Sequence, residues 1–289
     1  MAGLLDNLRA ALARAGAAGL AQAAGQALNQ LRGLDAPGAA AVVADELGRE
    51  LAACLAAEPQ AALAELARRL EELAGRQACL GCGTCCRVSS PTLYATDLDL
   101  IGDGGLPRSA LYSLRAGERV HSARLGRSLA LDRDLIKLRE TPGGGCLLLE
   151  GSRCGIYHHR PLQCRHLECW SGRHAGGLQD RPRLERRVLF AGDDIALALL
   201  AEYELRLPGA ELAQTLEAAA SGGDPAPALA LLELDHGLRA GISARHGYPS
   251  PELDLLLGRP ARVVALAHGL RLTLDNRGRP CLAGLSRPR

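Results

Sequence analysis

Two stretches of the sequence, CLGCGTCC at residues 79–86 and GGCLLLEGSRCGIYHHRPLQCRHLEC at residues 144–169, decide how the chain is organised. The chain has 289 residues and 10 cysteines, and eight of those cysteines fall within the two stretches. They are Cys79, Cys82, Cys85, Cys86, Cys146, Cys154, Cys164 and Cys169. The first residues, MAGLLDNLRA, lack the basic and then apolar character of a signal peptide, which favours a cytoplasmic location with reduced thiols. Thiols clustered in this way predict metal binding rather than disulfides.

The first stretch contains two consecutive C-x-x-C steps, a spacing at which a tight turn brings sulfurs to one metal. Gly81 and Gly83 suit such a turn, because glycine adopts positive φ and lets backbone N–H groups approach the sulfurs. The adjacent pair Cys85 and Cys86 is different, since neighbouring side chains usually diverge. We therefore expect either two nearby centres, or one cluster and an additional thiol that is reactive or does not bind the metal.

The second stretch places Cys164 shortly after Pro161, a residue that suits the first position of a helix. The helix N-terminus, together with Arg160 and Arg165, is expected to lower the pKa of Cys164 and favour its thiolate. The eight thiols already supply enough ligands, so the neighbouring histidines are weaker ligand candidates. Cys54 and Cys281 lie outside the pattern and are expected to be ordinary buried residues.

Charge excludes two classes of partner and fits a third. The whole chain carries +2, too little for a general nucleic-acid or anionic-membrane surface, and no apolar run reaches the length that spans a bilayer. Residues 79–173, the cysteine block, contain 13 basic and 9 acidic residues. This local excess can balance the negative charge of thiolates on two divalent ions or on one iron–sulfur cluster. Metal ions are thus the expected partners, and a protein substrate or partner stays open.

Apolar spacing predicts an α+β protein, with mainly helical flanks around a small irregular cysteine-rich metal-binding core. The expected segments are an Ala/Leu-rich helical arm at 1–78, the cysteine block at 79–173 and a mainly helical region at 174–289. Helices are expected at 3–32 (weakened by glycines), 37–57, 59–75, 107–115, 195–207, 210–220, 225–240 and 251–257, and strands at 87–94 and 146–149, while 262–267 fits either. A bound metal would tie the two stretches together across the roughly 60 residues between them.

The order C-x2-C-x2-C-C, followed by a G-x-C segment and by C-x-I-Y-x-x-R-P-x-x-C-R, resembles the YkgJ-type CxxCxxCC cysteine-cluster family of bacterial proteins. The resemblance covers about residues 79–170, and the matching positions of its second half are Cys154, Ile156, Tyr157, Arg160, Pro161, Cys164 and Arg165. It implies a domain that chelates zinc or iron.

The cysteine pattern is also similar to that of flagellin lysine N-methylases, which implies S-adenosylmethionine and an iron–sulfur cluster as cofactors. The chain lacks the D/E-x-G-x-G-x-G signature of the common methyltransferase fold, so methyl transfer is the less favoured hypothesis. Three functions follow as hypotheses. The first is a metal-binding protein whose zinc or iron–sulfur centre, of the 4Fe–4S type if iron, is structural or redox active. The others are a protein lysine N-methyltransferase and a zinc-stabilised interaction module.

Overall fold

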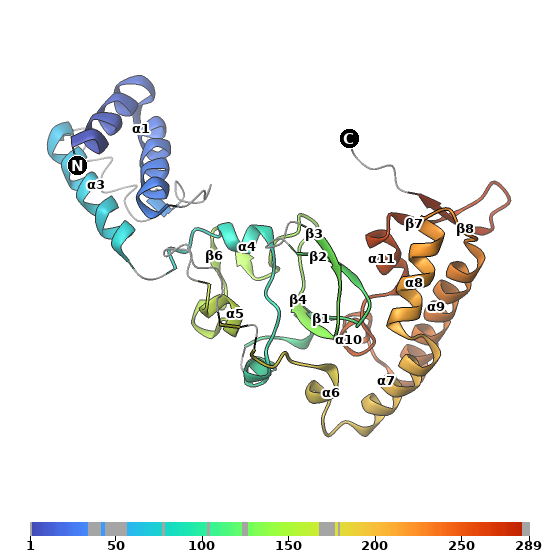
Figure 1. Cartoon of the computed structure of the whole chain (residues 1–289). Coiled ribbons are helices and arrows are strands. Elements are labelled where there is room, and N and C mark those ends of the chain that lie inside the picture. Colours follow the sequence, from blue (N-terminus) through green and yellow to red (C-terminus); the bar gives the residue numbers. More distant parts are fainter. Residues whose placement is uncertain are drawn as a thin grey trace. The chain divides into compact units, whose positions relative to one another are not determined.

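The computed structural model describes residues 2–33, 42–43, 57–76, 79–102, 105–122, 127–167, 177–178 and 180–284. It divides into two compact units, and each unit combines two separate stretches of chain (Figure 1). The first unit contains Met1–Ser90 and Glu140–Asp180, and the second contains Pro91–Arg139 and Arg181–Arg289. Helices and strands occur together, so the α+β prediction is confirmed. The division at 78 and 173 stays a prediction, and most of the helix expected at 37–57 lies outside the described residues.

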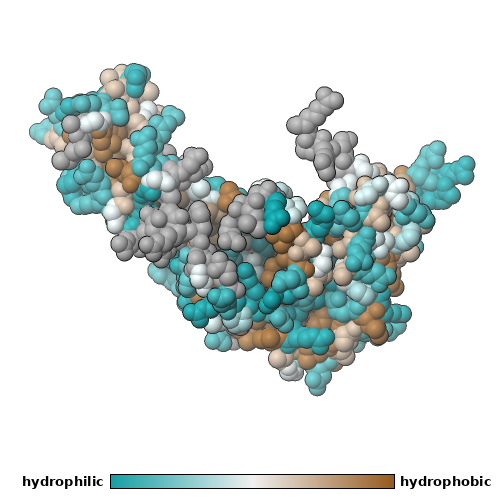
Figure 2. Space-filling view, in the orientation of Figure 1, coloured by the Kyte–Doolittle hydropathy of each residue, from teal (hydrophilic) through white to brown (hydrophobic). Residues whose placement is uncertain are grey.

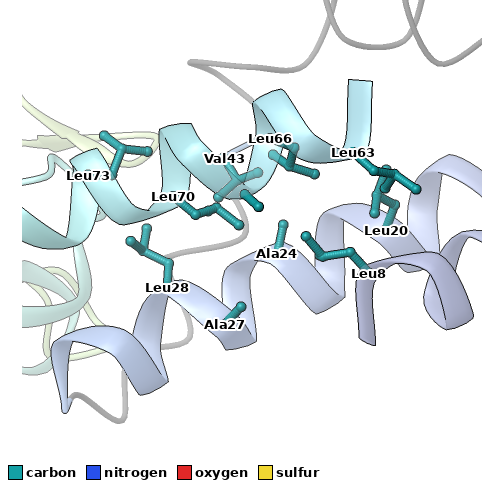
Figure 3. Close-up of a cluster of buried hydrophobic side chains, with 11 residues drawn as sticks. Leu8, Leu20, Ala24, Ala27, Leu28, Val43, Leu63, Leu66, Leu70 and Leu73 are labelled. Atoms are coloured by element: carbon teal, nitrogen blue, oxygen red, sulfur yellow. The ribbon is translucent and has the colours of Figure 1, made fainter. Parts of the chain in front are cut away.

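The helical arm of the first unit consists of α1 (Ala2–Arg32) and α3 (Pro59–Gly75). The weakness expected from the glycines of α1 is confirmed at Gly16, where φ is 57° and the helix kinks. Pro59 begins α3 as predicted, because its fixed φ suits the first turn and its missing N–H is not needed there. The two helices enclose a core of leucine and alanine, with Leu28 and Leu70 fully buried (Figure 3).

Arg32 joins the end of α1 to the end of α3. Its guanidinium is buried and donates to the Leu73 carbonyl at 2.9 Å and to the Arg76 carbonyl at 2.6 Å. Carbonyls at a helix C-terminus have no partner within the helix, so these bonds satisfy them. Leu80, which lies between the first two cysteines, packs against the same leucine core. The arm therefore anchors the beginning of the cysteine block.

The rest of the first unit consists of short elements. They are α4 (Thr84–Val88), the paired strands β5 (Leu149–Glu150) and β6 (Arg153–Cys154), the 3-10 helix η3 (Tyr157–His159) and α5 (Leu162–Arg165). Elements of two to five residues bury little apolar surface, so this region depends on turns and specific polar contacts.

In the second unit, residues 91–94 lie beside β4 (Leu135–Leu138) on one side and beside Leu184 on the other. The Leu93 N–H donates to the Ile136 carbonyl at 2.8 Å, and the Leu93 carbonyl accepts from the Leu184 N–H at 3.1 Å. The hydrogen bond between Leu93 and Ile136 thus joins the early and late parts of the long segment that separates the two cysteine stretches.

The remaining strands of the second unit form antiparallel pairs: β1 (Leu111–Leu114) pairs with β4, β2 (Arg119–Ser122) with β3 (Arg127–Ala130), and β7 (Leu270–Leu274) with β8 (Pro280–Gly284). Short 3-10 helices η1 (Ala95–Leu100) and η2 (Arg108–Ala110) precede β1. The α-helices are α6 (Arg186–Leu189), α7 (Asp194–Arg206), α8 (Gly209–Ala220), α9 (Ala226–His246), α10 (Ser250–Leu256) and α11 (Ala261–Ala267). They confirm the mainly helical C-terminal region (Figure 1).

A buried ionic network supports the second unit. The Arg115 guanidinium, 2% exposed, donates to both carboxylate oxygens of Glu204 at 2.9 and 2.8 Å and also to the Leu207 carbonyl. Arg186 reaches the same Glu204 at 2.8 Å and Asp134 at 2.6 Å. Burial alone would raise the pKa of the Glu204 carboxyl. The two arginines stabilise its charged form by more than burial disfavours it, so the pKa lies below the usual range. The network joins residues from the two stretches that form this unit.

Three local predictions are wrong in whole or in part. Residues 87–94, predicted as a strand, begin inside α4, because Gly83 in a left-handed conformation starts a helical turn that Arg87 continues, whereas Thr92 and Tyr94 form isolated β-bridges. Residues 107–115, predicted as a helix, form η2 and then β1, whose pairing with β4 outweighs helical preference. Only Leu149 of the strand predicted at 146–149 lies in a strand, since residues 147 and 148 form a turn. No helix in the described ranges is long and apolar enough to cross a membrane.

Candidate metal centre

The first cysteine stretch forms two tight turns that depend on glycine. Gly81 and Gly83 both have φ of 70°, which confirms the predicted positive values. The Gly81 N–H donates to the Cys79 sulfur at 3.4 Å, the type of backbone contact expected around a bound thiolate. A Cβ at Gly83 would lie 2.9 Å from the Ser152 carbonyl oxygen, so the turn packs tightly against the second cysteine stretch.

The adjacent cysteines do not diverge as predicted. The sulfurs of Cys85 and Cys86 lie 3.9 Å apart in α4. Two thiolates about 2.3 Å from one tetrahedral zinc ion are separated by about 3.8 Å, so the observed distance equals one edge of such a site. The general expectation fails here because the start of a helical turn allows both side chains to leave the backbone toward one side. The contact with Cys86 and burial together raise the pKa of Cys85 well above its usual range.

Hydrogen bonds join the two cysteine stretches. The Cys146 N–H donates to the Cys86 carbonyl at 2.6 Å. The Arg87 guanidinium donates to the Cys82 carbonyl at 2.8 Å and to the Gly151 carbonyl at 3.0 Å. No local pattern in the sequence identifies Arg87 as a side chain that bridges two segments 64 residues apart.

Cys164 is a partly buried thiol of the second stretch. Burial, as the largest cause, and the thiols of Cys85, Cys146 and Cys154 together raise its pKa to about 12. Thiols from both stretches thus contribute to the electrostatic environment of Cys164. The predicted lowering of this pKa is wrong: Arg160 does lower it, but the cost of burying a thiolate is larger. Cys164 does lie in the first turn of a helix, α5, as expected, although α5 has only four residues.

The non-cysteine residues around the centre are held by local contacts. The guanidinium of Arg160 donates to the Tyr157 carbonyl at 2.9 Å and lies 3.9 Å from the centre of the Tyr157 ring. His158 and His159 are exposed, and the ring of His166 contacts the Leu162 carbonyl at 3.1 Å. The assignment of the thiols, rather than the histidines, as the main donors stays a prediction.

Thiolates are the type of ligand that thiophilic metals prefer. The first unit contains such thiols from both stretches, most of them partly buried, and they influence one another electrostatically. In the described ranges, however, no three cysteine, histidine or acidic side chains already have a geometry that would hold an ion. Cys169, His174 and Cys54 lie outside those ranges. Cys281 is far from the pattern in sequence, and its sulfur lies 3.2 Å from the Thr273 hydroxyl in the β7–β8 hairpin.

Residues 78–182 match the family model CxxCxxCC, which is described as a "Putative zinc- or iron-chelating domain". The match confirms the resemblance inferred from the motif, and it supports metal binding by a cysteine cluster in this part of the chain. It does not extend to the helical arm or to most of the second unit. A search of curated proteins and a search of solved structures found no match.

Proposed function

We propose that the first unit binds zinc through thiolates from both cysteine stretches, and that the bound ion has a structural role. The observation that carries the proposal is the 3.9 Å separation of the Cys85 and Cys86 sulfurs, beside the hydrogen bond from the Cys146 N–H to the Cys86 carbonyl that joins the two stretches. The thiols of Cys85, Cys146 and Cys154 also raise the pKa of the partly buried Cys164 thiol, so thiols of both stretches share one electrostatic environment. A shared site for four thiolates is what a structural zinc ion requires.

The Cys85–Cys86 distance supports zinc over a 4Fe–4S cluster. In such a cluster each cysteine binds a different iron, whereas two sulfurs 3.9 Å apart match two ligands of one tetrahedral ion. The five sulfurs of Cys85, Cys86, Cys146, Cys154 and Cys164 exceed the four positions of a zinc ion. We propose that four of them bind it, and that Cys79, Cys82 and Cys169 lie at its edge or complete a second centre.

A bound zinc ion would act as a crosslink in a region that has little apolar core. The elements α4, β5, β6 and α5 each contain five residues or fewer. Such elements are marginal alone, and zinc binding supplies folding free energy directly. The hydrogen bonds of Arg87 and Cys146 already hold the two stretches near each other. The ion would therefore only need to fix the positions of the cysteine side chains.

Metal analysis of the full chain purified without oxygen tests the proposal. We expect a colourless protein with at least one zinc ion per chain, and less zinc in the Cys164→Ser and Cys85→Ser variants. Cys281→Ser is the matched control, because it removes a thiol from the β7–β8 hairpin and is expected to leave the zinc content unchanged. A brown protein that contains iron and acid-labile sulfide would overturn the zinc assignment in favour of an iron–sulfur centre.

A further inference from the structure

Helices α7 and α9 of the second unit enclose an open groove of about 560 Å³. Its lining includes the apolar side chains of Leu199 from α7 and of Leu234, Leu238 and Ile242 from α9, together with charged residues of both helices. The α7 helix also exposes Ile195 and Leu205, which are 58% and 78% accessible. The helical part of the molecule accordingly shows apolar patches among polar ones in Figure 2. Helices with apolar residues beyond their buried face commonly pack against a partner.

Two glycines in the middle of α9 line the same groove. An added Cβ at Gly237 or Gly241 would meet no described atom within 4 Å outside the helix backbone. Packing within the chain therefore gives no reason for them, although glycine is among the least favourable residues in a helix interior. A close external partner would give one, because a missing side chain lets a second helix approach.

The α9 residues of the groove form a pattern that is complementary to itself. They occupy positions 233, 234, 237, 238, 241, 242, 245 and 246. If a second α9 runs antiparallel, with the centre between residues 239 and 240, this set maps onto itself. Gly237 then faces Ile242 of the second copy, Leu238 faces its Gly241, and Glu233 faces its His246 beside Arg245. Gly237 and Gly241 each meet a larger residue, the acidic Glu233 meets the basic end of the second α9, and Leu234 faces Arg245.

We propose that this groove is the interface of a symmetric dimer, in which the α9 helices of two copies pack antiparallel. A two-fold interface uses the same patch on both copies, as this pattern requires. A parallel arrangement would place Glu233 against Glu233 and Arg245 against Arg245, so the charges select the antiparallel one. Neither Glu233 nor Arg245 has an ion-pair partner among the described residues, whereas Glu202 and Arg206 on the opposite wall already pair at 3.5 Å.

Sedimentation velocity of the full chain over a range of concentrations tests the proposal by charge reversal. We expect a concentration-dependent dimer. Glu233→Arg and Arg245→Glu should each weaken it by about tenfold or more, because each places like charges at two symmetry-related positions. The double variant, with both reversals, should recover most of the affinity, because the charges are complementary again. Both substitutions change exposed side chains, so folding is expected to be retained in all three variants, and circular dichroism would check it.

Gly237→Leu provides a second measurement that does not depend on charge. The added side chain faces open space in one copy but would collide with Ile242 of the other. We expect a variant that dimerises less and melts at an equal or higher temperature, since leucine favours the helix. A wild-type chain that is monomeric at all concentrations would overturn the proposal. So would a dimer that is insensitive to the single reversals, or one that the double reversal does not restore.

Discussion

The two units use different interactions to hold their chain segments together. In the thiol region of the first unit (residues 79–90 and 140–167), no helix or strand exceeds five residues, and contacts run through carbonyls, sulfurs and glycine turns. The helices of the second unit bury leucines such as Leu212, Leu216 and Leu256 and enclose paired arginines and carboxylates. The second unit thus has its own apolar core. The thiol region has little apolar core and instead contains thiols of the kind that bind metals.

This difference predicts how each part responds to perturbation. Apolar burial and buried ion pairs do not depend on a metal, so the second unit should tolerate chelation. If the proposed zinc ion is structural, the thiol region should not tolerate chelation, because the free energy of metal binding would replace core packing there. Each experiment below tests one side of this comparison.

The largest expected effect is that of metal removal on the thiol region. If zinc is structural, its loss removes on the order of 10 kcal/mol of binding free energy from this part of the fold. Hydrogen exchange followed by mass spectrometry should then show rapid exchange at residues 79–90 and 140–167 after chelation. The peptides of α7 to α9 should keep their protection. Equal loss in both units would show that the second unit also depends on the metal.

The next effect concerns the buried network of the second unit. Arg115→Ala removes a guanidinium that is 2% exposed and leaves the Leu207 carbonyl and part of Glu204 without a donor. We expect a loss of about 3–5 kcal/mol in the free energy of unfolding, measured by urea denaturation. Arg133→Ala is the control, because Arg133 is exposed and its loss should cost less than about 0.5 kcal/mol. If both variants lose equally little, the network does not stabilise the unit.

A smaller effect is expected for the tight turn of the thiol region. Gly83→Ala forces a side chain into a left-handed conformation and brings Cβ to 2.9 Å from the Ser152 oxygen. Strain of this kind costs about 1–3 kcal/mol, and we expect weaker zinc binding in a competition titration with a chromogenic chelator. Gly151→Ala has a similar φ of 62° but meets nothing within 4 Å among the described residues. Its effect should be smaller, and an equal effect would exclude the Ser152 contact as the cause.

The smallest effect is a pH dependence of the second unit. Burial lowers the pKa of His268, although its contact with Glu217 at 3.2 Å opposes the shift. The unfolded chain then binds a proton on His268 more readily than the folded chain, so stability falls as the pH decreases from about 6.5. Thermal unfolding should show this decrease in the wild type. His268→Gln should reduce it, and an unchanged slope would assign the pH dependence to other groups.

Regular elements with strong apolar spacing were predictable from the sequence. The leucine stripe of α3 and its initial Pro59 predicted a helix with the observed bounds. An aspartate before an apolar helical run is a typical N-cap signal, and Asp193 accepts from the Ala196 N–H at 2.9 Å. The hairpin of β7 and β8 was not predicted, because its alternation is short and its stability comes from packing on α11 and α9.

The spacing of the cysteines, by itself, determined that this chain has a thiol-rich region, which residues take part in it and what chemistry they offer. Local geometry is enough for that, since C-x-x-C turns and positive-φ glycines act over a few residues. Only the tertiary structure decided that the pKa of Cys164 is raised rather than lowered, by burial and by the thiols of Cys85, Cys146 and Cys154. The reason is physical: burial and the proximity of distant sulfurs depend on how the segments pack, and their cost exceeds the effect of a nearby arginine.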